Sequence, residues 1–179
     1  LEICKALHDH DVVFVTGGPS PDVRLGRHIR EIKLPGLMMD SGFSELFTTE
    51  KYRSAADVKA ERQKVLFELV ETERPDIFMV ELYPFGRKAF RFELDPVLER
   101  IGTTSEFSCR TVCSLRDILV EKKDAVKYER RVVDVLNRWF DALFVHSDPY
   151  VFSLDETFSM IEQIRVPIFY TGFVASKPN

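Results

Sequence analysis

The chain has 179 residues, of which 45% are hydrophobic, 12% aromatic and 30% charged, and its formal net charge is −4. This composition is typical of a globular α/β or α+β domain and argues against a collagen-like repeat, a coiled coil or a mainly disordered chain. No apolar run reaches the roughly 18 residues that span a bilayer, and the first residues lack the pattern of a secretory signal. We therefore expect a cytoplasmic protein. Because 29 acidic residues outnumber 25 basic ones, we expect no nucleic-acid partner.

The strands predicted along the chain are short apolar runs that alternate with helical segments. This alternation predicts an α/β fold with a mainly parallel sheet and helices on both faces, because parallel strands need crossover connections. Residues 1–7 have helical spacing without an N-cap and do not begin with Met, so we expect a preceding strand and loop outside this chain. The predicted strands are Val12–Thr16, Glu31–Pro35, Ile77–Leu82, Arg110–Leu115, Ala142–His146 and Pro167–Gly172.

Four longer helices are predicted between these strands, from apolar residues spaced three and four apart. Two of them open with a capping box, in which a serine and an acidic residue three positions later satisfy free backbone N–H groups. We expect them to start near Ser54, between Gly86 and Gly102, near Asp124 and near Ser153. The first should bury Val58, Val65, Leu66, Leu69 and Val70.

Residues 36–53 fit neither pattern, and the segment exceeds the usual loop length of a compact domain. It carries large apolar side chains, namely Met38, Met39, Phe43, Leu46 and Phe47. We interpret it as a short helix folded onto the core. The alternative is an exposed apolar loop that binds an acceptor or touches a membrane.

Polar and glycine residues gather at the carboxyl ends of several predicted strands, where ligands bind in an open α/β sheet. These candidate ligand-binding residues are Gly17, Gly18, Glu81, Tyr83, Gly86, Arg87, Arg116, Asp117 and His146. Arg87 opens a helix and is compatible equally with an anion cradle and with an internal ion pair to Glu81. His146 is predicted to end a strand. We favour a structural role, in which its ring forms hydrogen bonds within the protein, over a contact with a sugar hydroxyl.

Cysteine and histidine spacing predicts no metal site. The three cysteines form no CxxC pair, and the four histidines lack zinc-site spacing with them. We therefore expect reduced thiols, no bound metal and no cofactor.

Four segments resemble the amino-terminal half of bacterial glycosyltransferases of the GT-B type, which are similar to the UDP-N-acetylglucosamine transferase of peptidoglycan synthesis. They are YPFGRKAFRFEL, VCSLRDILVEK, FDALFVHSDP and YTGFVA, and the resemblance runs from about Leu1 to Ala175. It implies one Rossmann-like, acceptor-side domain over residues 1–179, which lacks its first strand and a carboxyl-terminal domain that holds most of the donor.

The resemblance implies an enzyme that, as a full-length protein, transfers a hexosyl or N-acetylhexosaminyl group from a nucleotide sugar. The acceptor is a glycan, a lipid or a small molecule, with peripheral contact to the inner face of the membrane left open. Tyr83, Arg87, Arg116, Asp117 and His146 are then expected to contact the acceptor or the domain interface. The catalytic base is not assigned, because the Gly-x-Gly-His loop of these enzymes does not occur here.

This chain alone is expected to be inactive. The alternatives are a regulatory module that binds a sugar nucleotide or phosphate, and a hydrolase or epimerase on the same scaffold. The oligomeric state is not predicted.

Overall fold

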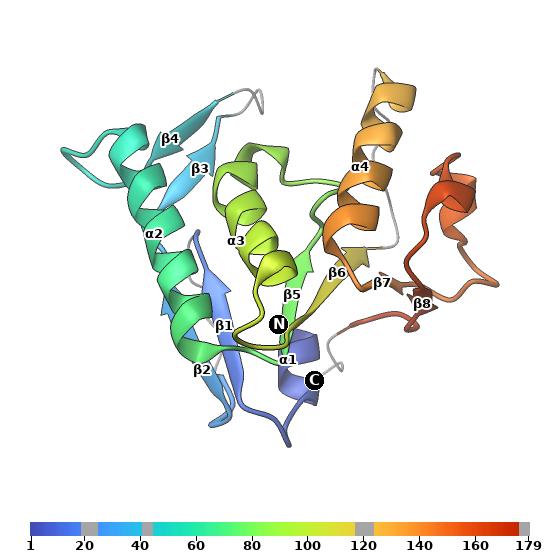
Figure 1. Cartoon of the computed structure of the whole chain (residues 1–179), viewed down its shortest axis with the longest axis horizontal. Coiled ribbons are helices and arrows are strands. Elements are labelled where there is room, and N and C mark those ends of the chain that lie inside the picture. Colours follow the sequence, from blue (N-terminus) through green and yellow to red (C-terminus); the bar gives the residue numbers. More distant parts are fainter. Residues whose placement is uncertain (19–24, 41–44, 117–123, 176–179) are drawn as a thin grey trace. The chain divides into compact units, whose positions relative to one another are not determined.

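The computed structural model describes residues 1–18, 25–40, 45–116 and 124–175, with the elements labelled in Figure 1. The described residues form two compact units. One comprises the residues up to Thr72 together with Ala175, and the other runs from Glu73 to Val174. That both belong to the single domain expected over residues 1–179 stays a prediction.

The first unit combines a short helix, a parallel strand pair, an antiparallel strand pair and a long helix. Its elements are α1 (Glu2–Ala6), β1 (Val12–Thr16), β2 (Ile29–Lys33), β3 (Leu37–Met39), β4 (Leu46–Thr48) and α2 (Ala55–Glu73). The predicted first helix and first strand are confirmed. The second strand starts two residues earlier than predicted and ends before Leu34, whose N–H still donates to the Thr16 carbonyl at 2.7 Å. Pro35 has no N–H with which to continue the pairing.

The predicted short helix within residues 36–53 is wrong. β3 and β4 pair there as antiparallel strands, from Leu37↔Thr48 to Met39↔Leu46. Leu37 is buried whereas its neighbour Met38 is exposed, so the side chains alternate with the two-residue period of a strand. Phe43 lies outside the described residues.

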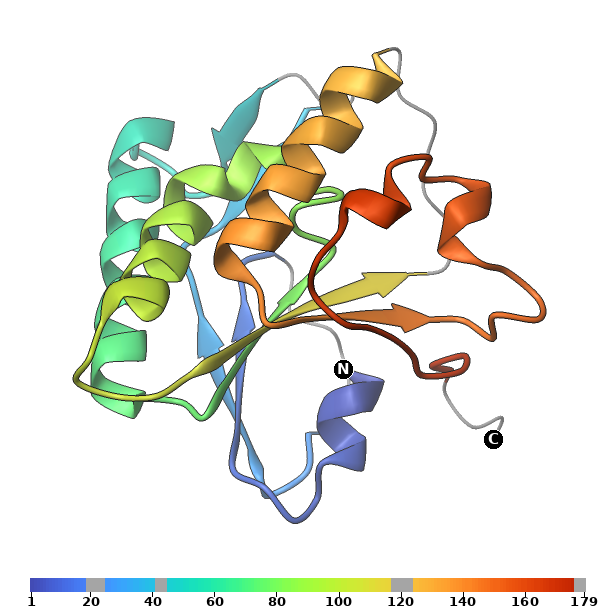
Figure 2. The ribbon, with the colours of Figure 1, turned by 45° about the vertical axis from the view of Figure 1, so that its right-hand side comes forward.

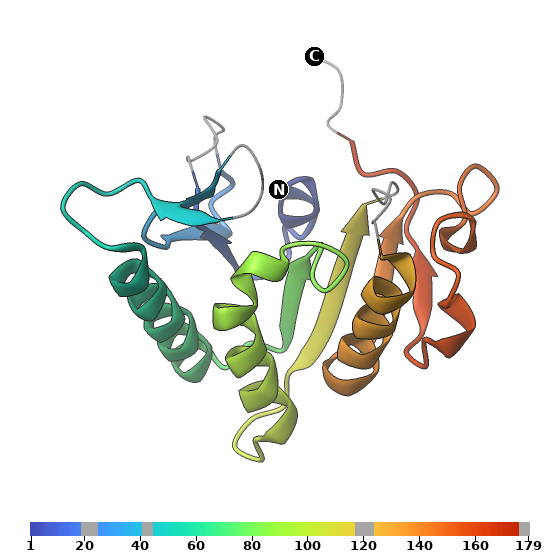
Figure 3. The same ribbon diagram turned by 90° about the horizontal axis from the view of Figure 1, so that it is seen from above.

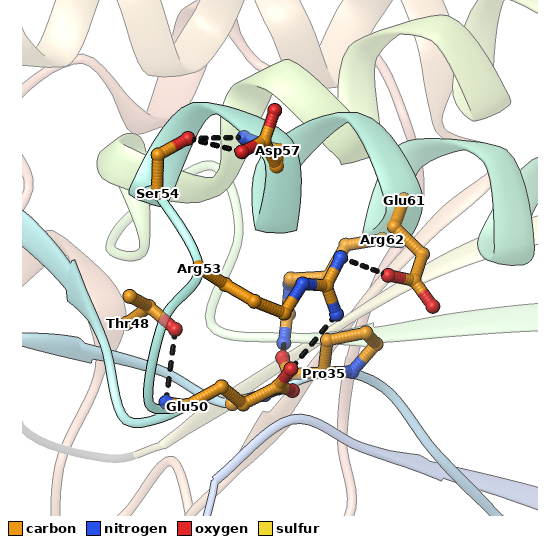
Figure 4. A network of polar contacts seen from close by, with 9 residues as sticks. Pro35, Thr48, Glu50, Arg53, Ser54, Asp57, Glu61 and Arg62 are labelled. Carbon is orange, nitrogen blue, oxygen red and sulfur yellow. Dashed lines mark hydrogen bonds and ion pairs between the residues drawn. The ribbon is translucent and has the colours of Figure 1, made fainter.

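α2 begins with the predicted serine cap (Figure 4). The Asp57 N–H donates to Ser54 Oγ at 3.0 Å, and Ser54 Oγ donates to the Asp57 carboxylate at 2.7 Å. Among the predicted core residues of this helix, Val58, Leu66 and Val70 are buried, and Val65 and Leu69 are half-buried. The cap and the apolar spacing therefore predict this helix correctly.

α2 also buries an arginine that apolar spacing does not reveal. Arg62 is buried and donates to the Pro35 carbonyl at 2.8 Å (Figure 4). It also donates to the Gly17 carbonyl at 3.3 Å. A Cβ atom at Gly17 would lie 2.3 Å from Arg62 Nη1. A side chain at Gly17 would therefore require a shift of this guanidinium, which donates to two backbone carbonyls of the first unit.

The second unit contains a four-stranded parallel sheet in the order β5-β6-β7-β8. Its strands are β5 (Ile77–Glu81), β6 (Arg110–Arg116), β7 (Ala142–His146) and β8 (Ile168–Tyr170). Its helical elements are η1 (Lys88–Phe90), α3 (Arg91–Thr103), α4 (Ala125–Trp139), η2 (Leu154–Glu156) and η3 (Ile161–Gln163). All four predicted strands of this unit are confirmed to within two residues at each end, and the unit is a mixed α/β structure flanked by helices.

The two long helices of this unit lie on the same face of the sheet (Figure 3) and run antiparallel to the strands (Figure 2). Neighbouring strands follow one another in sequence, so right-handed crossovers place α3 and α4 on one side. The expected helices on both faces are therefore seen on one face within this unit. Thr111 Oγ1 donates to the Trp139 carbonyl at the end of α4, which identifies the face of β6 that the helices cover. The apolar sheet residues buried on this face are Val80, Cys113, Leu115, Leu143 and Val145.

The helix predicted after Ser153 is wrong, although its capping box forms. The segment consists of the short 3-10 turns η2 and η3. Its backbone donors are taken by other elements: the Leu154 N–H donates to the Tyr170 hydroxyl at 3.0 Å, and the Met160 N–H donates to the Glu129 carboxylate of α4 at 2.9 Å. The bond from Met160 takes the place of one that would continue a helix, whereas the Leu154 N–H belongs to the first turn, where a helix leaves N–H groups free.

Asp141 joins the start of β7 to the start of β6. Its carboxylate accepts from Arg110 Nη1 and from the Thr111 N–H, each at 2.8 Å. Burial raises the pKa of this carboxyl, but the bonds from Thr111 and Arg110 outweigh it and hold the pKa below its usual value.

Replacing Asp141 by Asn is therefore expected to destabilise the protein in a pH-dependent way. A carboxyl with a lowered folded-state pKa stabilises above its unfolded pKa of about 3.9, and this contribution is lost as the pH falls through the folded value. We expect a loss of about 1 kcal/mol at pH 7, since the group is partly exposed, and a smaller difference below about pH 4. Urea denaturation at both pH values measures it. Asp155→Asn, which removes an exposed carboxylate, is the control; a difference that does not change with pH would contradict the ionic role of Asp141.

Candidate functional site

Side chains from all four strands of the second unit meet at the carboxyl edge of the sheet. The register pairs Glu81 with Ser114 and Arg116 with His146. Thr171 follows β8 directly, one position beyond the Val145↔Tyr170 pair. Because side chains two positions apart on a strand share a face, this register places all five on the face opposite to α3 and α4. We call Glu81, Arg87, Ser114, Arg116, His146 and Thr171 the carboxyl-edge cluster.

The charged half of the cluster is one carboxylate between two guanidiniums. Arg87 Nη2 donates to Glu81 Oε2 at 2.8 Å, and Arg116 Nη2 lies 3.4 Å from Glu81 Oε1. Two positive groups share one negative group, so this part of the cluster keeps one positive charge in excess. The internal ion pair expected for Arg87 therefore exists, while Arg116 remains 73% exposed and available to an anion.

The backbone that carries Arg87 is in an unusual conformation. Leu82 has φ +67° and Arg87 has φ +52°, in the left-handed region that side chains other than glycine rarely adopt. The Gly86 N–H donates to the Leu82 carbonyl at 2.6 Å and closes the turn between them. Such residues cluster at functional sites, and here the turn brings Arg87 back to the end of β5.

The uncharged half of the cluster is a histidine held between two hydroxyl groups. His146 Nε2 lies 2.7 Å from Ser114 Oγ, and Nδ1 lies 2.7 Å from Thr171 Oγ1. Burial lowers the pKa of His146, opposed by the nearby Glu81 carboxylate. The imidazole is therefore neutral at pH 7. Both ring nitrogens have partners, so His146 is a satisfied histidine at the strand end, and its contact with a ligand stays a prediction.

Two other predicted site residues of this unit, Tyr83 and Gly86, have structural roles outside this cluster. Tyr83 is buried and donates its hydroxyl to Asp95, and burial together with this bond raises its pKa. Gly86 serves the turn described above. Gly17 and Gly18 follow β1 in the first unit and belong to a different sheet. Asp117 lies outside the described residues.

Two members of the cluster, Ser114 and Thr171, were not predicted from the sequence. Ser114 is the polar residue within the apolar strand VCSL, two positions before Arg116. Residues two positions apart on a strand share a face, so this spacing could have indicated that Ser114 lies beside Arg116. The sequence around Thr171 does not indicate a site residue, because a threonine before a glycine is also common where a strand ends in a turn.

The described residues hold neither a metal cluster nor a membrane-spanning helix. No group of three or more His, Cys, Asp or Glu side chains among them is placed to hold a metal ion. Within the same residues, no helix combines the length and the apolar character needed to cross a bilayer. Two surface hollows, of about 400 and 300 Å³, lie along α4 and between α3 and α4, away from the carboxyl-edge cluster.

No protein-family model, curated protein or solved structure matches this chain. What the protein does must therefore be inferred from its sequence pattern, its fold and the geometry of the cluster.

Proposed function

We propose that the second unit belongs to the acceptor-side, Rossmann-like half of a nucleotide-sugar-dependent glycosyltransferase of the GT-B type, and that its acceptor binds at the carboxyl-edge cluster. The observation that carries the proposal is where the resembling segments meet. YPFGRKAFRFEL contributes Arg87, VCSLRDILVEK contributes Ser114 and Arg116, FDALFVHSDP contributes His146 and YTGFVA contributes Thr171. Each of the four segments thus supplies part of one cluster, at the edge of a parallel sheet where ligands bind.

In the proposed reaction an acceptor hydroxyl oxygen bonds to the anomeric carbon of the sugar. The bond from that carbon to the nucleoside diphosphate breaks, the diphosphate leaves with the bonding electrons, and a base takes the acceptor proton. The carboxyl-edge cluster supplies positioning and positive charge rather than the base. A second domain would hold most of the nucleotide sugar.

The test is an assay of the whole reading frame with UDP-, GDP- and dTDP-sugars, following release of the nucleoside diphosphate. The chain of 179 residues, assayed in parallel, is expected to show no turnover, because alignment of donor and acceptor requires both halves. Turnover by this chain alone would contradict the two-domain proposal. Failure of the whole protein to bind any nucleotide sugar would contradict the transferase itself.

The positive charge in excess at Arg116 also favours one alternative, a regulatory module that binds a sugar nucleotide or phosphate. Such a module needs no second domain. Strong binding of a nucleotide sugar to the 179-residue chain alone would favour it over the transferase.

A hydrolase on the same scaffold has less support. Ser114 and His146 are placed like a nucleophile and its base, but Ser114 is only 5% exposed, so a substrate does not reach its Oγ.

A further inference from the structure

Residues 82–87, which connect β5 to η1, form a turn whose centre is buried, and we call them the β5–η1 turn. Pro84 and Phe85 at this centre are both withdrawn from water. The carbonyls of a buried turn need donors from elsewhere in the protein. Tyr128 of α4 donates its hydroxyl to the Phe85 carbonyl at 2.8 Å. Arg131 Nη2, from the same helix, donates to the Pro84 carbonyl at 3.1 Å.

The two donors on α4 are suited to hold the turn in one place. Tyr128 and Arg131 are three positions apart and therefore lie on one face of the helix. The Arg131 guanidinium lies 5.8 Å from the centroid of the Tyr128 ring, at the distance of a cation–π contact. Burial raises the pKa of Tyr128 to about 12, so its hydroxyl keeps its hydrogen at neutral pH. Removing either donor takes a hydrogen bond from a buried carbonyl, which destabilises the observed turn.

The β5–η1 turn needs such support because its ends are in an unfavourable conformation. Leu82 and Arg87 both have a positive φ, which residues other than glycine keep only where the surrounding structure holds them. The bonds from α4 supply part of this support. Edge-to-face packing of Phe85 against Phe158, with ring centroids 5.3 Å apart, supplies another part. The result is that the Arg87 side chain lies beside Glu81 at the end of β5.

We propose that Tyr128 and Arg131 are positioning residues of the carboxyl-edge cluster, which act through the β5–η1 turn on Arg87. The inference rests on the proposed function, in which this cluster is the acceptor site. Arg87 occupies Oε2 of Glu81, and Arg116 lies beside Oε1. By holding Arg87 on one carboxylate oxygen, α4 sets the arrangement of charge at the edge of the sheet without itself contacting a ligand.

The first experiment measures the order of the Arg87 side chain in the 179-residue chain. The readout is the 15N–1H heteronuclear NOE of its Nε–Hε group, which is high for an ordered group and low for a mobile one. Arg87→Lys assigns the signal, and Glu81→Ala gives the value for an Arg87 without its partner. Tyr128→Phe, which removes only the hydroxyl, is expected to lower the wild-type value toward that of Glu81→Ala. Arg131→Gln is expected to lower it as well, and it provides the test if Tyr128→Phe does not fold.

Three controls separate positioning from a general loss of stability. Tyr150→Phe removes the hydroxyl of an exposed tyrosine. Arg130→Gln removes a charge next to Arg131 on the exposed side of α4. Leu136→Ala weakens the packing of α4 about two helical turns beyond Tyr128. All three are expected to leave the order of the Arg87 side chain as in the wild type.

Three results of this experiment would overturn the inference. One is an Arg87 side chain that is no more ordered in the wild type than in Glu81→Ala. Another is an unchanged NOE in Arg131→Gln and in any folded Tyr128→Phe. The third is a loss of order in Leu136→Ala equal to that in these variants, which would show that Arg87 responds to stability alone.

The second experiment is a double-mutant cycle on kcat/KM for the acceptor in the whole protein. Tyr128→Phe and Arg87→Gln are each expected to lower it, by up to about tenfold, the scale of one lost hydrogen bond. Tyr128→Phe should cause no further loss when residue 87 is already glutamine, because residues that act through one contact are not additive. Equal losses in both backgrounds would contradict positioning through Arg87.

Failure of this inference is distinguishable from failure of the proposed function, because the NMR readout requires no turnover. If Tyr128→Phe releases Arg87 in a protein that binds no nucleotide sugar, positioning by α4 is supported and only the transferase is contradicted. If Tyr128→Phe and Arg131→Gln leave Arg87 ordered in an active transferase, the positioning role is contradicted and the proposed function stands.

Discussion

Replacement of Arg116 by Gln is expected to lower kcat/KM for the acceptor by about 10- to 100-fold in the whole protein. The substitution keeps a long polar side chain but removes the positive charge that Glu81 leaves uncompensated. A hydrogen bond to a charged group contributes about 1.5–3 kcal/mol, which corresponds to this range of rates. The measurement is release of nucleoside diphosphate at low acceptor concentration.

Arg110→Gln is the matched control for this variant. Arg110 is on the same strand as Arg116, and both side chains are 73% exposed, but Arg110 lies at the amino edge and pairs with Asp141. We expect its kcat/KM to stay within about twofold of the wild type. Equal losses in both variants would show a general effect of charge, and no loss in Arg116→Gln would remove Arg116 from the site.

Replacement of Leu136 by Ala is expected to lower the free energy of unfolding by about 2–5 kcal/mol, because it leaves a cavity beneath α4. Leu136 is fully buried. Urea denaturation measures the loss. The single tryptophan, Trp139, is on the same helix and reports on this unit by its fluorescence.

Val126→Ala tests the exposed side of the same helix. Val126 is 60% exposed, so its truncation is expected to change the unfolding free energy by less than about 0.5 kcal/mol. Similar values for the two variants would contradict the packing of α4 described above.

The strands could be predicted from the sequence where an apolar run is bounded by residues that end it. Ala142–His146 is the clearest case, with Asp141 before the run and Ser147 after it, and its predicted bounds are those observed. The prediction failed where tertiary contacts decide the local structure. Glu129 on α4 takes the Met160 N–H of the segment after Ser153, and no pattern within that segment reveals this distant partner.

In the candidate site, too, some residues could be predicted from the local sequence and others depend on tertiary structure. The rule that ligands bind at the carboxyl ends of parallel strands was enough to select Glu81, Arg87, Arg116 and His146. Their partners Ser114 and Thr171 depend on strand register, which requires the neighbouring strands to be known. The burial of Tyr83 also depends on three-dimensional packing, since a tyrosine after a strand is equally compatible with an exposed ligand contact.

The alternation of side chains along β6 separates two kinds of selective pressure within a single strand. Thr111, Cys113 and Leu115 point toward the helices, so changes at these positions act on packing. Ser114 and Arg116 point to the other face, where a change at the exposed Arg116 acts on the proposed ligand site. Under the proposed function, substrate preference can diverge during evolution through Arg116 at the end of this strand, while Thr111, Cys113 and Leu115 preserve the folded state.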